Sequence, residues 1–268
     1  MYKCNLTEEQ EQGIIASYLE GNKKDLVGEQ FSVSKWKVTE VLTRHGIKQR
    51  TGGQARSKYQ CNESFFDVID TEEKAYWLGF LAADGFLRSD KDQWGVTLST
   101  IDKSHLEKLK NSIEATHPVN EFIVNRAKGY FSCRLFVASK QMKDALVKNG
   151  VVEKKTDRML FPTKEQVPDH LIRHYARGYF DGDGSFYMDS RGRLIFNLLG
   201  TEEFLIGFKE AFDIENKVLK DARSIVHYIS VGAREKVLNL MNYLYEDATI
   251  YLERKYQKYI KITGPAGE

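Results

Sequence analysis

The chain has 268 residues, of which 41% are hydrophobic and only four are proline, so it can build a sizeable core and is not disordered throughout. Its 40 lysines and arginines nearly balance its 38 acidic residues, and the net charge of +2 argues weakly against a nucleic-acid-binding protein. That total ignores where the charges lie along the chain, so the local distribution has to be examined.

No stretch of the chain is apolar for the roughly 20 residues that a membrane-spanning helix needs. The three cysteines, Cys4, Cys61 and Cys133, are odd in number and far apart, which disfavours a disulfide framework and a zinc cluster. We therefore expect a soluble intracellular protein without membrane contact. It would reside in the cytoplasm or nucleoid if it is of bacterial or phage origin.

The first 50 residues predict a module of three helices. Thr7 is an N-cap for the first helix, which ends at residues 20–21. The second spans about residues 23–30, and the third spans about residues 34–45 after a three-residue turn. A short helix, a tight turn and a longer helix are typical of a helix-turn-helix DNA-binding module.

The third predicted helix carries the side chains that would touch DNA. Trp36, Val38 and Leu42 are expected on its packing side. Residues 33–60 hold seven lysines and arginines against one glutamate, a local charge of +6. This charge favours DNA over a protein partner for the module. The candidate DNA contacts are Lys35, Lys37, Thr39 and Arg44.

Residues 51–70 begin with small and basic side chains and are predicted to be a linker. Beyond the linker the chain repeats itself. Residues 75–85 and 174–184 are both apolar helical runs that end in Asp-Gly, with Asp183 placed 99 residues after Asp84.

Similar patterns of strands and helices follow both runs, and each unit is predicted to be αββαββα. Hairpin turns are expected at Lys128-Gly129 in the first unit and at Arg191-Gly192 in the second. The predicted fold class is α+β, with a helix-turn-helix at residues 1–50 and two pseudo-symmetric repeats at residues 71–158 and 159–268.

The two helical runs carry small residues at four-residue spacing, namely Gly79 and Ala83 in one and Gly178 and Gly182 in the other. Such spacing lets two helix backbones approach closely. Gly85 and Gly184 are expected to end the helices as left-handed caps. We therefore expect the two helices to pack side by side, with both aspartates at one edge.

Two carboxylates at adjacent negative helix ends repel each other and need a cation between them. Hard oxygen ligands with open positions suit Mg²⁺, and Mn²⁺ can substitute for it. Such a site can activate a water and stabilise a leaving oxygen during phosphodiester hydrolysis. Asp84 and Asp183 are therefore the predicted metal ligands. The alternative is that Asp-Gly is only a common helix stop signal.

The two runs, Trp77-Leu-Gly-Phe-Leu-Ala-Ala-Asp-Gly85 and Ala176-Arg-Gly-Tyr-Phe-Asp-Gly-Asp-Gly184, resemble the paired motifs of double-motif LAGLIDADG homing endonucleases. The resemblance covers about residues 65–263. It implies that Asp84 and Asp183 are the catalytic metal ligands. Asp181 has Ala82 as its counterpart, so we leave it out of the catalytic pair.

The resemblance also implies a basic residue near each active site, after the last helix of each repeat. Lys155 lies 71 residues after Asp84, and Lys255 lies 72 residues after Asp183. Both are therefore predicted to be catalytic, because a lysine there can polarise the attacking water or stabilise charge on the phosphorane. The alternative is an ordinary solvated lysine.

The family's four-stranded antiparallel sheets are saddle-shaped and read the major groove with one face. Alternation over residues 130–137 puts Phe131, Cys133, Leu135 and Val137 on the helix side and Arg134 on the DNA side. Arginine can pair with guanine and asparagine with adenine. The predicted DNA contacts of the sheets and their turns are Arg88, Arg126, Lys128 and Arg134 in the first repeat, and Tyr187, Arg191, Arg193 and Asn197 in the second.

The sequence thus predicts a monomeric, Mg²⁺-dependent endonuclease that cuts both strands of double-stranded DNA at a long asymmetric site and leaves short 3′ overhangs. Helix-turn-helix modules are appended to some homing endonucleases of this kind. Two alternatives share the fold. One is a catalytically silent DNA-binding regulator, which retention of both aspartates disfavours, and the other is an intron maturase that acts on RNA.

Overall fold

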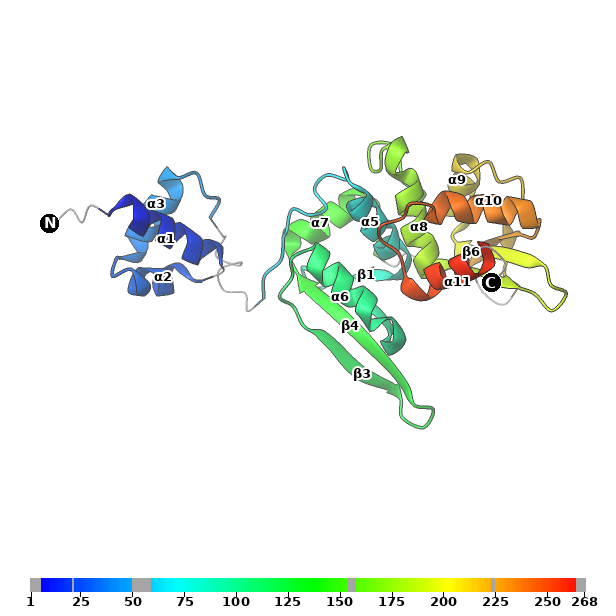
Figure 1. Cartoon of the computed structure of the whole chain (residues 1–268), viewed down its shortest axis with the longest axis horizontal. Coiled ribbons are helices and arrows are strands. Elements are labelled where there is room, and N and C mark those ends of the chain that lie inside the picture. The colour runs from blue at the N-terminus through cyan, green and yellow to red at the C-terminus, as the bar shows by residue number, and fades with distance from the viewer. Residues whose placement is uncertain (1–5, 21, 50–58, 154–157, 223–224, 264–268) are drawn as a thin grey trace. The chain divides into compact units, whose positions relative to one another are not determined.

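The computed structural model describes residues 6–20, 22–49, 59–153, 158–222 and 225–263. The chain divides into two compact units, residues 1–60 and 61–268 (Figure 1). Among the described helices, none has both the length and the apolar character to cross a membrane. The mixed α/β content and the two four-stranded antiparallel sheets of the second unit confirm the predicted fold class.

The first unit is a bundle of α1 (Glu8–Leu19), α2 (Lys24–Gln30) and α3 (Lys35–Arg44). A capping box begins α1, because the Thr7 hydroxyl accepts a hydrogen bond from the Gln10 N–H at 3.2 Å while Gln10 Oε1 accepts one from the Thr7 N–H at 3.0 Å. The bundle closes over a small core of its own. The buried members of that core are Ile14, Ile15, Tyr18, Val27, Val38, Val41 and Leu42.

Trp36 was expected on the packing side of the third helix, and that prediction is wrong. Its side chain is 72% exposed, whereas Val38, Val41 and Leu42 are fully buried. Positions 38, 41 and 42 form one stripe at spacings of three and four, and position 36 lies outside it. The helix therefore presents Trp36 to solvent beside Lys35 and Lys37.

The second unit begins within the predicted linker. Cys61 is its first residue, and Phe65, Phe66 and Ile69 are buried in its core. Residues 61–69 therefore belong to this unit, and residues 50–58 lie outside the described part of the chain.

The two repeats have the same order of elements. The first contains α5 (Glu72–Asp84), β1 (Gly85–Leu87), β2 (Gln93–Ser99), α6 (Lys103–Ser112), β3 (Val119–Asn125), β4 (Tyr130–Ala138) and α7 (Lys140–Lys148). The second contains α8 (Ile172–Asp183), β5 (Gly184–Met188), β6 (Leu194–Gly200), α9 (Glu202–Ala211), β7 (Leu219–Lys220), β8 (His227–Val231) and α10 (Arg234–Tyr245). A further helix, α11 (Glu253–Thr263), follows and was not predicted.

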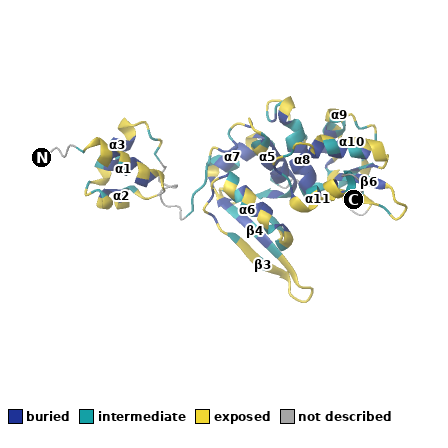
Figure 2. Ribbon diagram, viewed as in Figure 1, coloured by how far each residue is buried: buried dark blue, intermediate teal, exposed yellow. Residues whose placement is uncertain are grey.

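The two sheets have matching topology, β1-β2-β4-β3 and β5-β6-β8-β7, with all neighbouring strands antiparallel. Helices α5, α6 and α7 pack on the first sheet, and α8, α9 and α10 pack on the second. In β4 the helix-facing side chains Cys133, Leu135 and Val137 are buried, as their alternation predicts (Figure 2). We call the opposite face of each sheet its open face; there Arg134 and Phe136 of β4 are half-exposed.

Phe131 has the parity of the helix side but is 47% exposed. The hairpin of β3 and β4 extends past α6, so its end has no helix to cover it (Figure 1). At that end Gly129 has φ 66°, and Gly192, in the turn between β5 and β6 of the second sheet, has φ 73°. Both hairpin turns fall where the sequence placed them, and both use the left-handed conformation that glycine favours.

Helices α5 and α8 pack backbone against backbone at the centre of the unit. A Cβ added to Gly79 would lie 2.0 Å from the Tyr175 carbonyl oxygen, and one added to Gly178 would lie 2.0 Å from that of Tyr76. A Cβ on Gly182 would lie 2.3 Å from Ala83 Cβ. Each small residue therefore meets the other helix, and the predicted side-by-side packing is confirmed.

The prediction that Gly85 and Gly184 are left-handed caps is wrong. Their φ values are −69° and −94°, so both residues are extended and already belong to β1 and β5. Glycine is required for another reason. A Cβ at Gly85 would lie 2.5 Å from the Leu81 carbonyl oxygen, and one at Gly184 would lie 2.1 Å from Phe180 Cδ2. The chain passes from helix to strand too tightly for a side chain.

We predict that Gly79→Ala or Gly178→Ala destabilises the second unit by about 3 kcal/mol or more, because the new methyl group meets a backbone oxygen that cannot rotate away. The free energy of unfolding in urea measures the effect. Gly232→Ala is the control, because its Cβ would meet only the end of the Ile195 side chain at 3.3 Å. Equal unfolding midpoints for Gly79→Ala and Gly232→Ala would contradict the close helix contact.

Candidate active site

Asp84 and Asp183 are the last residues of α5 and α8, and each is half-buried directly before the first strand of its repeat. The close packing of the two helices brings their ends together. A Cβ at Gly182 would lie only 3.3 Å from Asp84 Oδ2, so the Asp84 carboxylate reaches across to the last turn of α8 beside Asp183. The two predicted metal ligands therefore converge.

The negative charges of both carboxylates shift the pKa values of the same two buried side chains, Tyr179 and Lys255. Burial raises the pKa of the Tyr179 hydroxyl, and the negative charges of Asp183 and Asp84 raise it further. Burial lowers the pKa of Lys255 to about 8. The carboxylates of Asp181, Asp84 and Asp183 oppose this change, because their negative charges raise the pKa. The aspartate pair thus shares one electrostatic environment with Lys255 and Tyr179.

Lys255 lies in α11 and is 6% exposed. Its ammonium group donates to the carbonyl oxygens of Phe180 at 2.6 Å, Asp181 at 2.8 Å and Gly184 at 2.6 Å. These carbonyls form the C-terminal end of α8, where the helix dipole is negative. Because three acceptors use its three protons, Lys255 acts here as a buried cap and counter-ion behind the aspartates. Its predicted catalytic role stays a prediction.

Asp181, which we left out of the catalytic pair, is fully buried beneath the site. Its carboxylate accepts hydrogen bonds from the hydroxyls of Tyr76, at 2.7 Å, and Tyr245, and from the Leu252 N–H at 2.7 Å. Burial raises its pKa, while Lys255 and these donors lower it again in part. Asp181 therefore links α8 to α5, to α10 and to the residue before α11. The last of these links fixes the position of α11, which carries Lys255.

A second buried link between the repeats also escaped prediction. The Arg177 side chain is fully buried and pairs with Glu72 Oε1 at 2.6 Å, while it donates to the carbonyl oxygens of Ile250 and Leu244 at 2.9 Å each. Arg254 pairs with Asp102 at 3.0 Å. The sequence held one indication of this link, the charged Arg177 inside an apolar helical run.

The carboxylate pair fits a hard divalent cation. Gly182 leaves open the space beside Asp84 Oδ2 that a larger residue would fill. Among the described residues, no group of three or more histidine, cysteine, aspartate or glutamate side chains is placed to hold a metal. Asp84 and Asp183 would therefore supply two oxygen ligands, leaving the remaining positions to waters and substrate phosphate oxygens, as Mg²⁺ prefers.

Lys155, the predicted partner of Lys255 in the first repeat, lies outside the described residues, which omit 154–157. Its catalytic role stays a prediction.

The predicted DNA contacts of the first unit lie on α3 and are held by acidic neighbours. Lys35 pairs with Asp25 at 2.9 Å, Lys37 with Glu40 at 3.1 Å, and Arg44 with Glu11 at 2.9 Å. Thr39 is half-buried on the same helix. The Lys35–Asp25 pair is exposed and therefore weak, so this lysine can exchange its carboxylate for a phosphate, whereas the Glu11 carboxylate that holds Arg44 is buried.

The predicted contacts of the sheets fall into two groups. Arg88 and Arg193 pair with Asp90 and Asp189 at 2.8 Å each, and Asn197 Nδ2 donates to the Tyr187 hydroxyl at 3.3 Å. The second group has exposed, cationic side chains at the ends of the hairpins and no ion pair to the described residues. Its members are Arg126, Lys128 and Arg191. Arg134 belongs to neither group, because its guanidinium packs against the Phe122 and Phe136 rings.

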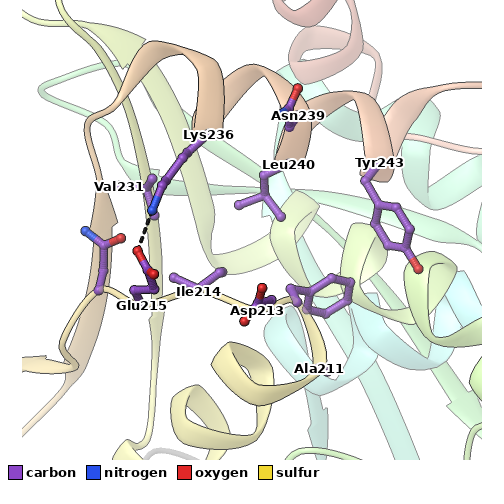
Figure 3. A pocket seen from close by; sticks show the side chains of 11 residues that line it. Ala211, Asp213, Ile214, Glu215, Val231, Lys236, Asn239, Leu240 and Tyr243 are labelled. Carbon is purple, nitrogen blue, oxygen red and sulfur yellow. Dashed lines mark hydrogen bonds and ion pairs between the residues drawn. The ribbon is translucent and has the colours of Figure 1, made fainter.

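A pocket in the second repeat lies away from these residues. It is formed by α10 and the segment after α9, with apolar side chains such as Ile214, Leu240 and Tyr243 inside and the Glu215–Lys236 ion pair on one side (Figure 3). None of its lining residues belongs to the predicted catalytic or DNA-binding set. We assign it no part in the chemistry.

No protein-family model matches the chain, and no curated protein matches it. Several solved structures are similar to it. The meganuclease I-SmaMI bound to uncleaveable DNA is 14% identical with a TM-score of 0.48, over 73% of this chain and 89% of that one. I-AabMI bound to uncleaved DNA is 14% identical with a TM-score of 0.46, over 70% and 89%. The I-LtrWI LAGLIDADG homing endonuclease bound to target DNA is 12% identical with a TM-score of 0.47, over 75% and 90%.

We predict that the stability of the protein depends on the titration of Lys255. Its lowered pKa means that the folded chain releases this proton near pH 8, whereas the unfolded chain holds it up to about pH 10.5. Between these values the unfolded state binds more protons, so stability rises with pH by an amount on the order of 3 kcal/mol from this group.

Lys255→Met removes that contribution, so the wild type should gain stability relative to the variant from pH 8 to about pH 10.5. Urea unfolding at a series of pH values measures the difference. Lys261→Met, an exposed lysine of the same helix, is the control and should follow the wild type. A difference between wild type and Lys255→Met that does not change with pH would be evidence against the lowered pKa.

Proposed function

We propose that this chain is a site-specific, Mg²⁺-dependent endonuclease that cuts both strands of double-stranded DNA, in the manner of double-motif LAGLIDADG homing endonucleases. The observation that carries the proposal is the convergence of Asp84 and Asp183 at the adjacent ends of α5 and α8, each followed at once by a strand. Two carboxylates at one edge of a pseudo-symmetric unit are the arrangement that two-strand cleavage needs.

The proposal gives the residues around the two aspartates separate roles. Asp84 and Asp183 hold the metal, which when bound supplies an activated water and neutralises charge on the phosphate. Lys255 offsets the combined negative charge of the aspartates and the end of α8, and so keeps the pair close before metal binds. Gly85 and Gly184 let β1 and β5 start immediately beside the aspartates, so DNA lying on the sheets would place its phosphates at the site.

The open faces of the two sheets would take one half of the target each, which makes the recognised sequence long and asymmetric while one chain suffices to cut both strands. Short 3′ overhangs are the product expected of cuts across the minor groove. The first unit would add an anchor outside this site through α3, whose exposed face carries Lys35, Trp36 and Arg44.

Asp84→Asn and Asp183→Asn are each expected to lower double-strand cleavage far more than the roughly 10- to 100-fold that loss of an outer-shell partner costs a metal site. Affinity for the target should remain, because an amide keeps the shape of the carboxylate but binds Mg²⁺ poorly. Cleavage of a plasmid carrying a site recovered by in vitro selection measures the first effect, and a binding isotherm measures the second.

Asp144→Asn is the matched control, because it removes an exposed carboxylate that pairs with Lys140 on α7. It should cut as the wild type does. If Asp84→Asn and Asp183→Asn both cut at the wild-type rate, the assignment of these residues fails. If the wild type binds its site tightly with Mg²⁺ and never cuts, the chain is a DNA-binding regulator instead.

The anchor role of the first unit predicts a salt effect. Exchanging Lys35, Lys37 and Arg44 for glutamine should weaken binding to all sequences alike and reduce the slope of log affinity against log salt by about 0.9 for each phosphate that is no longer neutralised. The cleavage rate at saturating protein should not change. Cleavage that disappears even at saturation would place these residues in the reaction itself.

A further inference from the structure

The open face of the first sheet carries aromatic rings around a single arginine. Phe86 on β1, Phe136 on β4 and Phe122 on β3 all point away from the helices, because their cross-strand partners and the alternation of β4 place them opposite Cys133 and Leu135. All three rings are half-exposed. An ordinary solvated sheet face has little reason to hold three phenylalanines.

Two of the rings, Phe86 and Phe136, pack against each other over a glycine. Gly95 of β2 lies between Phe86 and Phe136 in the register of the sheet, and the two rings meet above it at 5.4 Å between centroids. A Cβ on Gly95 would lie 2.6 Å from the Leu135 carbonyl oxygen, 2.9 Å from the Phe86 ring and 3.1 Å from the Phe136 ring. The glycine thus allows one continuous apolar surface across three strands.

Arg134 is fixed in the middle of this surface. Its Nε donates to the Thr97 hydroxyl at 2.7 Å, and its guanidinium lies 4.7 Å from the centre of the Phe122 ring, 5.3 Å from that of Phe136 and 5.9 Å from that of Phe86. Within the described residues it forms no salt bridge. Cation–π contacts and one hydrogen bond therefore hold the guanidinium in place and leave its Nη groups for a ligand.

The matching face of the second sheet differs in kind. There Ser185 lies opposite Asn197, and the Asn197 amide donates to the Tyr187 hydroxyl. Tyr228 occupies the place that Arg134 has in the first sheet, as the cross-strand registers show. The first sheet thus offers phenylalanine rings around a fixed cation, whereas the second offers the Asn197 amide and tyrosine hydroxyls beside the exposed Leu199.

We propose that the first sheet reads its half of the target through thymine methyl groups, which contact Phe86, Phe122 and Phe136, and through a guanine that pairs with Arg134. In the major groove the thymine 5-methyl group is the apolar feature, and guanine O6 and N7 accept the two Nη donors of an arginine. The inference rests on the proposed function, because it needs DNA on this face.

Placement on the sheet favours DNA as the occupant. Phe86 lies two residues after Asp84 on the strand that starts at the candidate active site. The hairpin that carries Phe122 and Arg134 ends in the exposed cations Arg126 and Lys128, which suit phosphates. A protein partner would need no such cations beside the rings, and it becomes an outcome of the test.

The test uses the full-length wild-type protein and a target recovered by in vitro selection. Each thymine is replaced in turn by deoxyuridine, which removes only the methyl group. We expect a cluster of positions, confined to one half of the site, at which each replacement weakens binding by about fourfold, the effect of one buried methyl group. At a nearby guanine, exchange of G·C for A·T should cost about 5- to 150-fold.

Two variants tie these positions to the residues. Phe122→Ala should bind thymine and deoxyuridine equally at one or more of the sensitive positions, and Arg134→Lys should lose most of its guanine preference. Phe131→Ala is the matched control, because this exposed ring lies on the opposite face of the same hairpin. It should keep the wild-type discrimination, and circular dichroism checks that each variant is folded.

A wild type that binds and cuts its site without any deoxyuridine-sensitive position overturns this inference and leaves the proposed function standing. So does sensitivity that Phe122→Ala and Phe131→Ala change equally. Failure of the wild type to bind any DNA overturns both, and would point to a protein partner for the rings.

Discussion

The contact between α5 and α8 determines the rest of the second unit. Gly79 and Gly178 let the two helix backbones touch, so each helix can bury its motif face against the other instead of against a sheet. Because the helices come from different repeats, this one contact fixes the pseudo-symmetry. It also places the last residue of each helix, an aspartate, at the same edge. The candidate site is thus a consequence of backbone packing.

That packing creates an electrostatic problem. Two negative helix ends, Asp84, Asp183 and the buried Asp181 come together within one small region. Lys255 opposes them with a charge held on three carbonyl oxygens, and two tyrosine hydroxyls and the Leu252 N–H satisfy Asp181. The net charge of +2 says nothing of this, because it averages an acidic centre with a basic α3 and basic hairpin ends.

Much of the fold could be predicted from the sequence. Apolar periodicity and the two Asp-Gly endings located the repeats, and Lys128-Gly129 and Arg191-Gly192 located the hairpins, because these signals are local. What could not be predicted depends on contacts between distant segments. The orientation of Lys255 follows from where α11 packs, and the place of Asp181 follows from Tyr76 and Tyr245, which lie 105 and 64 residues away.

The errors have the same origin. Trp36 was placed on the packing side because its side chain is apolar. Its position in the helix, outside the buried stripe of Val38, Val41 and Leu42, would have predicted exposure. The glycines after the aspartates were interpreted as caps, although the neighbouring Leu81 and Phe180 are what exclude a side chain. The aspartate pair itself was predictable, because its signal is doubled by the repeat.

The most direct measurement of the central claim is a map, at nucleotide resolution, of the cuts that the full-length protein makes in a plasmid carrying its selected site, with Mg²⁺ and with a chelator. One cut in each strand, staggered across the minor groove to leave 3′ overhangs and absent with the chelator, is the expected result. Nicks scattered over the plasmid, a single cut strand, or cleavage that persists in the chelator would contradict a metal site shared by Asp84 and Asp183.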